Sequence, residues 1–205
     1  YYELGDGLDV VDKINGITDN SEKNYWTMNT INLKDKTFEV FISDAEISAI
    51  VHSISNQINN SGVKDPLFIG VMNGAFLFAA DVMRKITISN AEISFIKLSS
   101  YEGTETTGKV DELIGISDDI SGRNIIVLED IIDTGITLEK IISLLKKEDV
   151  SDIKVATLLF KPDAYTKDMQ IDFIGKSIPN DFVVGYGLDY DEIGRNFPHI
   201  YKLKN

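Results

Sequence analysis

Acidic and hydroxyl side chains gather directly behind an apolar run between residues 125 and 137. The run Ile125–Leu128 is apolar at every position, as in a strand that is buried on both faces of a sheet. It is followed by the carboxylates of Glu129 and Asp130, and then by the turn Asp133-Thr134-Gly135. Helical spacing of apolar residues starts near Ile136. We therefore expect a strand, a turn and a helix, with polar side chains at the junction.

The junction at residues 133–137 predicts an anion site. A helix that begins near Ile136 leaves its first N–H groups unpaired, and its dipole places partial positive charge there. Gly135 has no side chain to block the approach of a ligand, and the hydroxyls of Thr134 and Thr137 can donate hydrogen bonds. Such a cradle suits a phosphate monoester.

The carboxylates of Glu129 and Asp130 predict a second ligand group beside that phosphate. They would repel a phosphate placed on them, but they can accept hydrogen bonds from vicinal hydroxyls or bind a divalent cation. A ribose 5-phosphate carries both groups. The alternative is a polar turn in which Asp133 or Thr134 caps the helix. Because the whole pattern follows a buried strand, we favour the ligand site.

The surrounding chain alternates between strand and helix patterns. Short apolar runs predict strands at residues 67–71, 92–98, 153–160 and 182–185. Helical spacing marks residues 47–58, 74–85 and 138–145. Ser43 and Glu46 have the spacing of a capping box, in which both side chains satisfy free N–H groups. The alternation predicts an α/β fold with a parallel twisted sheet flanked by helices, and in such sheets ligands bind beyond the carboxyl ends of the strands.

Composition excludes several classes of function. The 205 residues include 33 acidic and 20 basic side chains, and the formal charge of −13 disfavours a nucleic-acid partner. Cysteine is absent, so thiolate catalysis, disulfides and zinc–cysteine sites are ruled out. Both histidines, His52 and His199, are expected at the solvated surface. No apolar stretch approaches ~20 residues and no signal pattern is present, so we expect a cytoplasmic protein without a membrane partner.

The first part of the chain differs from the rest. Residues 1–27 are rich in Asp, Asn and Gly and give no strong strand pattern. We interpret them as a leader or fusion remnant of unknown role. Residues 28–205 are long enough for a single domain with its own hydrophobic core.

Two segments resemble a known family. Residues 127–137, VLEDIIDTGIT, resemble the phosphoribosyl pyrophosphate motif of type I phosphoribosyltransferases. Residues 177–204, SIPNDFVVGYGLDYDEIGRNFPHIYKLK, resemble the C-terminal region of the hypoxanthine-guanine phosphoribosyltransferases. The likeness runs from about Lys34 to Lys204. It implies the type I phosphoribosyltransferase fold, with a small hood that N- and C-terminal segments build over the carboxyl ends of the strands.

The resemblance implies an enzyme of purine salvage. Such an enzyme uses Mg²⁺ and transfers the 5-phosphoribosyl group of phosphoribosyl pyrophosphate to hypoxanthine or guanine, giving IMP or GMP and pyrophosphate. Magnesium would neutralise the pyrophosphate and steady it as a leaving group. Glu129 and Asp130 match the pair that holds the ribose hydroxyls, and with Asp189 they are the implied metal ligands. Thr134, Gly135, Ile136 and Thr137 match the phosphate cradle. Family members usually form homodimers or homotetramers.

The resemblance also assigns residues to the purine base. Asp133 matches the general acid/base set against N7, a role that typically contributes ~10²–10⁴-fold to the rate. Lys161 matches the donor to the 6-oxo group, Phe182 the aromatic that stacks on the base, and Val183 a residue that offers main-chain hydrogen bonds. Asp189 also matches a residue near the 2-substituent. A lysine that faces the oxo group would select against adenine, because two donors would then be left unpaired.

Three further segments match other parts of the family's site. Arg195 matches an arginine whose planar fork suits phosphate oxygens. Met72, Asn73 and Gly74 occupy the first pyrophosphate loop, where the family uses main-chain N–H groups and often has a cis peptide bond. Many members carry lysine where this chain has Asn73, so only the main-chain role carries over. Ser100 and Tyr101 match the catalytic loop at residues 99–110, whose closure would keep water from the reactive ribosyl group.

Other functions remain as alternatives. One is a phosphoribosyltransferase that prefers xanthine or adenine, another is a phosphoribosyl pyrophosphate sensor that binds RNA or DNA, and a third is a simple nucleotide-binding or interaction protein. Asp133, Lys161 and Phe182, which a pure sensor need not retain, favour the enzyme, as does the scatter of the basic residues. The preference among hypoxanthine, guanine and xanthine depends on placement around Val183 and Asp189, which the sequence alone does not determine.

Overall fold

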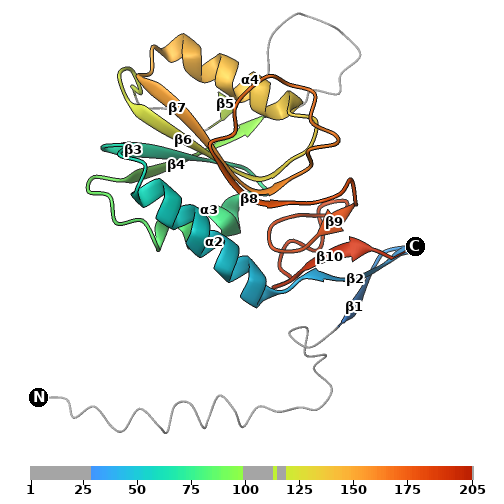
Figure 1. Ribbon diagram of the computed structural model, residues 1–205. Helices are drawn as coiled ribbons and strands as arrows, with labels where there is room; N and C mark the ends of the chain where they lie inside the picture. Colours follow the sequence, from blue (N-terminus) through green and yellow to red (C-terminus); the bar gives the residue numbers. More distant parts are fainter. Residues whose placement is uncertain (1–28, 99–112, 115–118, 205) are drawn as a thin grey trace, which may run out of the picture.

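A mostly parallel sheet forms the centre of the molecule (Figure 1). The computed structural model describes residues 29–98, 113–114 and 119–204. The strand order is β5-β4-β3-β6-β7-β8, and only β5 (Leu113–Ile114) runs antiparallel to its neighbour. The parallel strands, in spatial order, are β4 (Glu92–Leu98), β3 (Pro66–Val71), β6 (Asn124–Ile132), β7 (Asp152–Phe160) and β8 (Phe173–Ser177).

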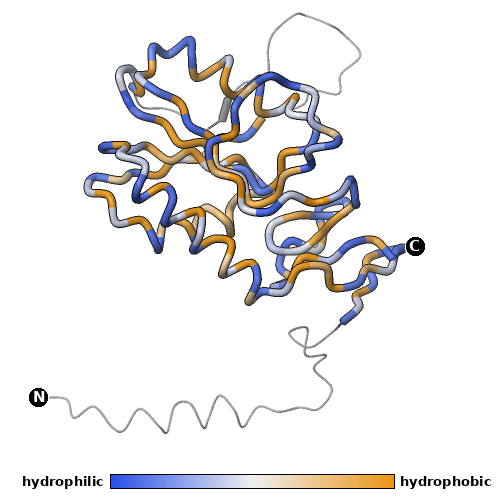
Figure 2. The backbone as a smooth tube through the Cα atoms, viewed as in Figure 1, coloured by the Kyte–Doolittle hydropathy of each residue, from blue (hydrophilic) through white to orange (hydrophobic). Residues whose placement is uncertain are grey.

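Helices cover both faces of this sheet (Figure 1). On one face lie α2 (Asp44–Asn59) and α3 (Phe76–Met83). On the other lies α4 (Ile136–Leu145), which continues into the 3-10 turn η2 (Lys146–Glu148). Alternate residues of β6 join the two cores, which explains why residues 125–128 are apolar at successive positions. Hydrophobic residues are coloured orange in Figure 2. The predicted α/β fold with a parallel sheet flanked by helices is confirmed.

A second, antiparallel sheet is built from both ends of the described chain. Its order is β1-β2-β10-β9, with strands β1 (Thr30–Leu33), β2 (Lys36–Ile42), β10 (Ile200–Leu203) and β9 (Val183–Val184). Gly187, between β9 and β10, packs against the carbonyl group of Gly74, which follows β3. The segment that connects β9 to β10 therefore lies at the carboxyl ends of the parallel strands. The domain boundary at residue 28 stays a prediction.

Local signals explain where the main helix begins. Ser43 is the N-cap of α2, and its hydroxyl accepts a hydrogen bond from the Glu46 amide at 3.2 Å. The predicted capping box is only half formed, because the Glu46 carboxylate pairs instead with Lys176 on β8 at 2.7 Å. Among the described residues, no helix has the length and apolar character that a membrane span requires.

Strand β8 was not predicted from the sequence, and Gly175 at its centre gives the reason. A Cβ atom on Gly175 would lie 2.5 Å from the Leu158 carbonyl oxygen and 2.6 Å from Ile50 Cγ2. Helix α2 can approach the sheet closely only because this side chain is missing. The glycine weakens the strand pattern in the sequence, but the packing of α2 on the sheet requires a glycine at this position. The run at 182–185 does form a strand, but in the second sheet.

Ser55 in α2 provides a test of the packing. It is fully buried, and within the described part of the chain its hydroxyl has no hydrogen-bond partner. Ser55→Ala should raise the free energy of unfolding by roughly 1 kcal/mol or more, because it removes an unsatisfied buried hydroxyl. Ser48→Ala at an exposed site of the same helix is the matched control for helix propensity. Urea unfolding followed by circular dichroism measures both, and a less stable Ser55→Ala variant would contradict the packing described.

Candidate active site at the ends of the parallel strands

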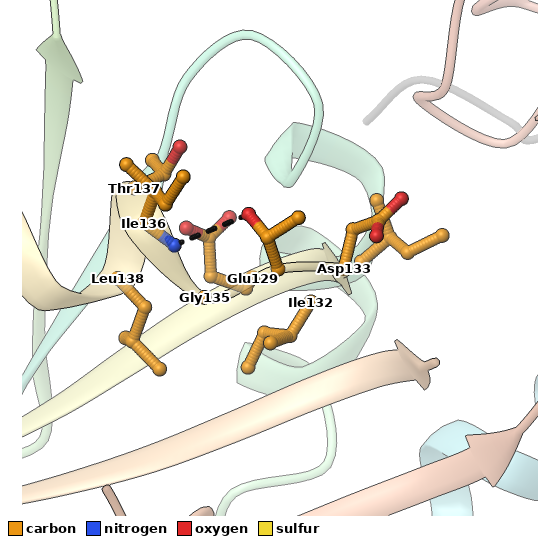
Figure 3. A pocket seen from close by; sticks show the side chains of 9 residues that line it. Glu129, Ile132, Asp133, Gly135, Ile136, Thr137 and Leu138 are labelled. Carbon is orange, nitrogen blue, oxygen red and sulfur yellow. Dashed lines mark hydrogen bonds between the residues drawn. The ribbon is translucent and has the colours of Figure 1, made fainter. Parts of the chain in front are cut away.

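The chain turns sharply where β6 gives way to α4. Gly135 occupies the N-cap position with φ of 82°, a left-handed conformation that glycine adopts most easily. A pocket of about 90 Å³ opens over this turn, lined by Glu129 and residues 131–138 (Figure 3). The predicted strand, turn and helix are therefore present, and Glu129, Asp133 and the residues of the predicted phosphate cradle surround one pocket.

The turn is not a side-chain cap, contrary to the alternative considered from the sequence. The N-cap residue of α4 is Gly135 rather than Asp133 or Thr134, and the Thr134 hydroxyl accepts from the Ile136 amide only at a long 3.5 Å. A Cβ atom on Gly135 would lie 2.5 Å from the ring of Tyr165, so the glycine is also required by packing of the segment after β7. From the sequence, Gly135 was expected only to let a ligand approach. Its contact with Tyr165 was not predicted, because nothing in the sequence around Tyr165 indicates that it packs on this turn.

Two adjacent carboxylates are buried beside this turn. Glu129 is 5% exposed and Asp130 is 9% exposed. Burial raises the pKa of Glu129 well above its ordinary value, and the neighbouring Asp130 charge raises it further. Burial likewise raises the pKa of Asp130 to about 6, although main-chain N–H groups and the charge of Arg195 oppose the shift. The pair therefore favours a ligand that brings positive charge or hydroxyl donors.

The same pair fits a magnesium ion. Hard carboxylate oxygens suit Mg²⁺, which usually takes one or two of them and completes its shell with water and substrate phosphates. Among the described residues, no three His, Cys, Asp or Glu side chains form a metal-binding group of their own. Asp189 is engaged elsewhere, since it accepts from Arg195 at 2.7 Å and from the Glu192 amide at 2.8 Å. The predicted ligands Glu129, Asp130 and Asp189 are thus not gathered into one cluster.

Asp133 and Lys161 come from the ends of neighbouring strands and form an ion pair. The Lys161 ammonium donates to Asp133 Oδ2 at 2.9 Å, and the Lys161 residue is only 7% exposed. The main chain supports the arrangement, because the Lys161 amide donates to the Ile132 carbonyl at 3.0 Å. Figure 3 shows Asp133 on the side of the turn away from Thr137. Sequence reasoning placed both residues at the base but did not predict that they would bond to each other.

Phe182 stands at the edge of the second sheet with 46% of its surface exposed. Its ring packs on Phe38, with centroids 6.2 Å apart, and edge-on against Tyr190 at 5.8 Å. An apolar pattern alone would place Phe182 in the core, whereas the structure leaves much of the ring open to solvent. Val183 is buried in β9, which is the last strand of its sheet, so within the described part of the chain one edge of its main chain has no neighbouring strand.

The predicted pyrophosphate residues converge beside the carboxylate pair. The peptide bond between Met72 and Asn73 is cis. A Cβ atom on Gly74 would overlap the Asp130 carboxylate, and one on Gly187 would overlap the Gly74 carbonyl oxygen. Arg195 Nη1 donates to the Gly187 carbonyl at 2.8 Å. Sequence reasoning missed Gly187, although its place in the run Gly185-Tyr186-Gly187 is a signal for an unusual backbone.

The predictions for Ser100, Tyr101 and the two histidines have different outcomes. Ser100 and Tyr101, predicted for the catalytic loop, lie outside the described residues. His52 is exposed, as expected, but the expectation for His199 is wrong: it is 8% exposed. His199 Nδ1 accepts from the Asp44 amide at 3.0 Å, because the histidine packs where β10 meets the start of α2. The individual substrate, metal and catalytic roles remain predictions.

The chain matches one domain family and many curated and solved proteins. Residues 42–191 match the family described as "Phosphoribosyl transferase domain". A hypoxanthine phosphoribosyltransferase of Escherichia coli is 39% identical over 172 residues, which cover 82% of this chain and 96% of the relative. A hypoxanthine-guanine phosphoribosyltransferase of Staphylococcus aureus is 36% identical over 81% of this chain and 93% of its own. The crystal structure of a Bacillus anthracis hypoxanthine-guanine phosphoribosyltransferase has a TM-score of 0.72 at 38% identity and covers 82% of this chain and 97% of that one.

The raised pKa of Asp130 predicts a pH-dependent stability. Because the folded pKa of about 6 exceeds the ordinary 3.8, the ionised group destabilises the folded state increasingly as pH rises through 6. Without ligand, Asp130→Asn should raise the free energy of unfolding at pH 8 by roughly 1–3 kcal/mol, at about 1.4 kcal/mol per pKa unit. The gain should disappear near pH 4.

Urea unfolding at several pH values measures this difference. Asp168→Asn, at an exposed carboxylate, is the control and should change stability little at any pH. An Asp130→Asn variant that is less stable than the wild type at pH 8 would show that the buried charge is compensated within the protein.

Proposed function

This chain belongs to the phosphoribosyl transferase family, and from that membership we propose that it transfers the 5-phosphoribosyl group of phosphoribosyl pyrophosphate to hypoxanthine or guanine. The products would be IMP or GMP and pyrophosphate. The observation that carries the proposal is the Asp133–Lys161 pair beside the pocket at the start of α4. The names of the relatives support the same reaction.

The start of α4 suits the 5-phosphate. The N-cap residue Gly135 has no side chain to cap the first amides of the helix, the Ile136 amide meets the Thr134 hydroxyl only at a long 3.5 Å, and Thr137 also lines the pocket. The pocket volume of about 90 Å³ offers room for a small anion such as a phosphate group. Helix dipole and amide donors favour a phosphate there. The buried carboxylates of Glu129 and Asp130 would then face the ribose hydroxyls.

The Asp133–Lys161 pair suits the N7 and O6 edge of a 6-oxopurine. These purine positions are adjacent, and the two side-chain ends are 2.9 Å apart. Lys161 would donate to the oxo group, while Asp133 would accept the N7 proton as the base attacks the sugar carbon. The negative charge of Asp133 also favours the cationic ribosyl group in the transition state. The open face of Phe182 provides a surface on which the base can stack.

The pyrophosphate side uses main-chain and arginine donors. Asn73 is uncharged, so the first loop offers main-chain N–H groups rather than a lysine. Arg195 is held by Asp189 and by the Gly187 carbonyl, which fixes the direction of its fork. Bound Mg²⁺ would neutralise the leaving pyrophosphate and raise its ability to depart. Glu129 and Asp130 would hold that ion, in part through water.

We also propose assembly into a homodimer or homotetramer. Support comes from the family, in which the structure of a Trypanosoma cruzi hypoxanthine phosphoribosyl transferase was studied for the role of its C-terminal region in oligomeric state and activity. That protein is 28% identical to this chain.

A spectrophotometric assay tests the function directly. Purified protein with Mg²⁺ and phosphoribosyl pyrophosphate should convert hypoxanthine or guanine, and adenine should be a poor substrate. Removal of Mg²⁺ with a chelator should abolish turnover, and added Mg²⁺ should restore it. Absence of turnover with every 6-oxopurine would refute the proposal, and a clear preference for adenine would replace it with another base specificity.

Asp133→Asn tests the proton-transfer role. The amide cannot accept the N7 proton, so kcat should fall by roughly 10²–10⁴-fold while phosphoribosyl pyrophosphate still binds. Asp163→Asn, an exposed carboxylate two residues beyond Lys161, is the matched control and should retain turnover. Full activity of Asp133→Asn with every base would remove Asp133 from the chemistry.

Lys161→Gln tests the selection of the 6-oxo group. Glutamine can both donate and accept, so the penalty against a 6-amino group should fall. The ratio of kcat/KM for hypoxanthine to that for adenine should drop by roughly 10–100-fold, as expected for loss of a charged hydrogen bond. An unchanged ratio would mean that another residue recognises the 6-substituent of the purine.

A further inference from the structure

Tyr186 has a backbone conformation that is unfavourable for its residue type. It lies between Gly185 and Gly187 in the loop after β9, and its φ is 49°. The two glycines also have positive φ, 97° and 100°. A left-handed conformation brings the Cβ atom of an ordinary residue close to its own carbonyl oxygen. Main-chain hydrogen bonds from the Tyr186 amide to the Phe197 carbonyl at 2.8 Å and from the Gly187 amide to the Arg195 carbonyl at 2.9 Å help to hold this conformation, and the contacts of the Tyr186 side chain add to them.

The side chain of Tyr186 is anchored on α3. It is 7% exposed, and its hydroxyl donates to Asp81 Oδ2 at 2.7 Å. Burial, and then the hydrogen bond to Asp81, raise the pKa of Tyr186, so the phenol remains a donor at neutral pH. Hydrogen bonds to a carboxylate are stronger than those between neutral groups. Asp81 is half-buried and also lines a pocket between α2 and α3.

The loop that carries Tyr186 contacts the loop of residues 72–74 across the proposed pyrophosphate site. Helix α3 begins at Phe76, directly after the loop of residues 72–74. Gly187 is the next residue after Tyr186, and it meets the Gly74 carbonyl so closely that no Cβ atom fits. Its own carbonyl accepts from Arg195 at 2.8 Å. The Tyr186–Asp81 bond therefore ties the Gly187 loop to α3, the helix that directly follows the 72–74 loop on the pyrophosphate side of the proposed site.

We propose that Tyr186 is a positioning residue for pyrophosphate binding. Its hydrogen bond to Asp81 fixes the Gly187 loop on the 72–74 loop, so that the main-chain groups of one loop and Arg195 of the other face the same ligand. The inference rests on the proposed function, which assigns both loops to pyrophosphate. Tyr186 acts through these loops and does not itself contact the substrate. The base side, at Lys161 and Phe182, is formed by other contacts.

Tyr186→Phe tests this role because it keeps the ring and removes only the hydroxyl. The KM for phosphoribosyl pyrophosphate should rise about tenfold, in line with the loss of one hydrogen bond to a charged group. The KM for hypoxanthine at saturating phosphoribosyl pyrophosphate should not change. Asp81→Asn keeps an oxygen acceptor and should have a smaller effect than Asp81→Leu. The double variant Tyr186→Phe/Asp81→Leu should be no worse than either single change, because both remove the same bond.

Tyr190→Phe is the matched control. Tyr190 also donates to a carboxylate, Asp35, at 2.8 Å, but in the second sheet beside Phe182. It should leave the KM for phosphoribosyl pyrophosphate unchanged. An unchanged KM in Tyr186→Phe would overturn the inference. So would an equal rise in both KM values together with a lower melting temperature, since that is the result of a purely structural role.

Calorimetric titration with Mg²⁺ and phosphoribosyl pyrophosphate separates the two proposals. Wild-type protein that binds this ligand but converts no purine would contradict the proposed function, and the dissociation constant of Tyr186→Phe would still decide the positioning role. Wild-type protein that does not bind the ligand would overturn both.

Discussion

The burial of two adjacent carboxylates at the end of β6 is the constraint on which the site depends. Glu129 and Asp130 are almost entirely removed from solvent, and Arg195 is the cation that lowers the pKa of Asp130. Burying such charges without full compensation is costly. This free-energy cost falls on the Glu129–Asp130 pair, and a bound ligand that brings hydroxyl groups and a cation would offset it. The proposed affinity for a magnesium-bound sugar phosphate and the expected loss of stability without it would thus have the same origin.

The parallel sheet explains why the other groups meet there. β3, β6 and β7 are neighbours, and their carboxyl ends release the 72–74 loop, the 133–135 turn and Lys161 on the same edge. Close approach then depends on backbone without side chains. Gly74 contacts the Asp130 carboxylate and Gly187 contacts the Gly74 carbonyl, so the loop from the second sheet packs on the loop that covers this carboxylate. Larger residues would separate the proposed sugar and pyrophosphate sites.

Much of this arrangement could be predicted from the sequence, because its signals are local. Apolar runs and helical spacing located β3, β4, β6, β7, α2 and α4, and the 127–137 motif located the turn. What could not be predicted depends on contacts between distant segments. The strand pattern of β8 is interrupted by Gly175, a glycine that the packing of α2 requires. His199 is buried because β10 meets the start of α2. The Asp133–Lys161 bond and the Tyr186–Asp81 bond likewise arise only when separate strands and loops are placed together.

Proton release on ligand binding tests the central claim about the buried carboxylates most directly. Calorimetric titration of phosphoribosyl pyrophosphate with Mg²⁺ at pH 6, in buffers of different ionisation enthalpy, measures the number of protons exchanged. Because the pKa of Asp130 is raised to about 6, cation binding should expel its proton, and the wild type should release more protons than Asp130→Asn. Equal proton release by the two proteins would contradict the account.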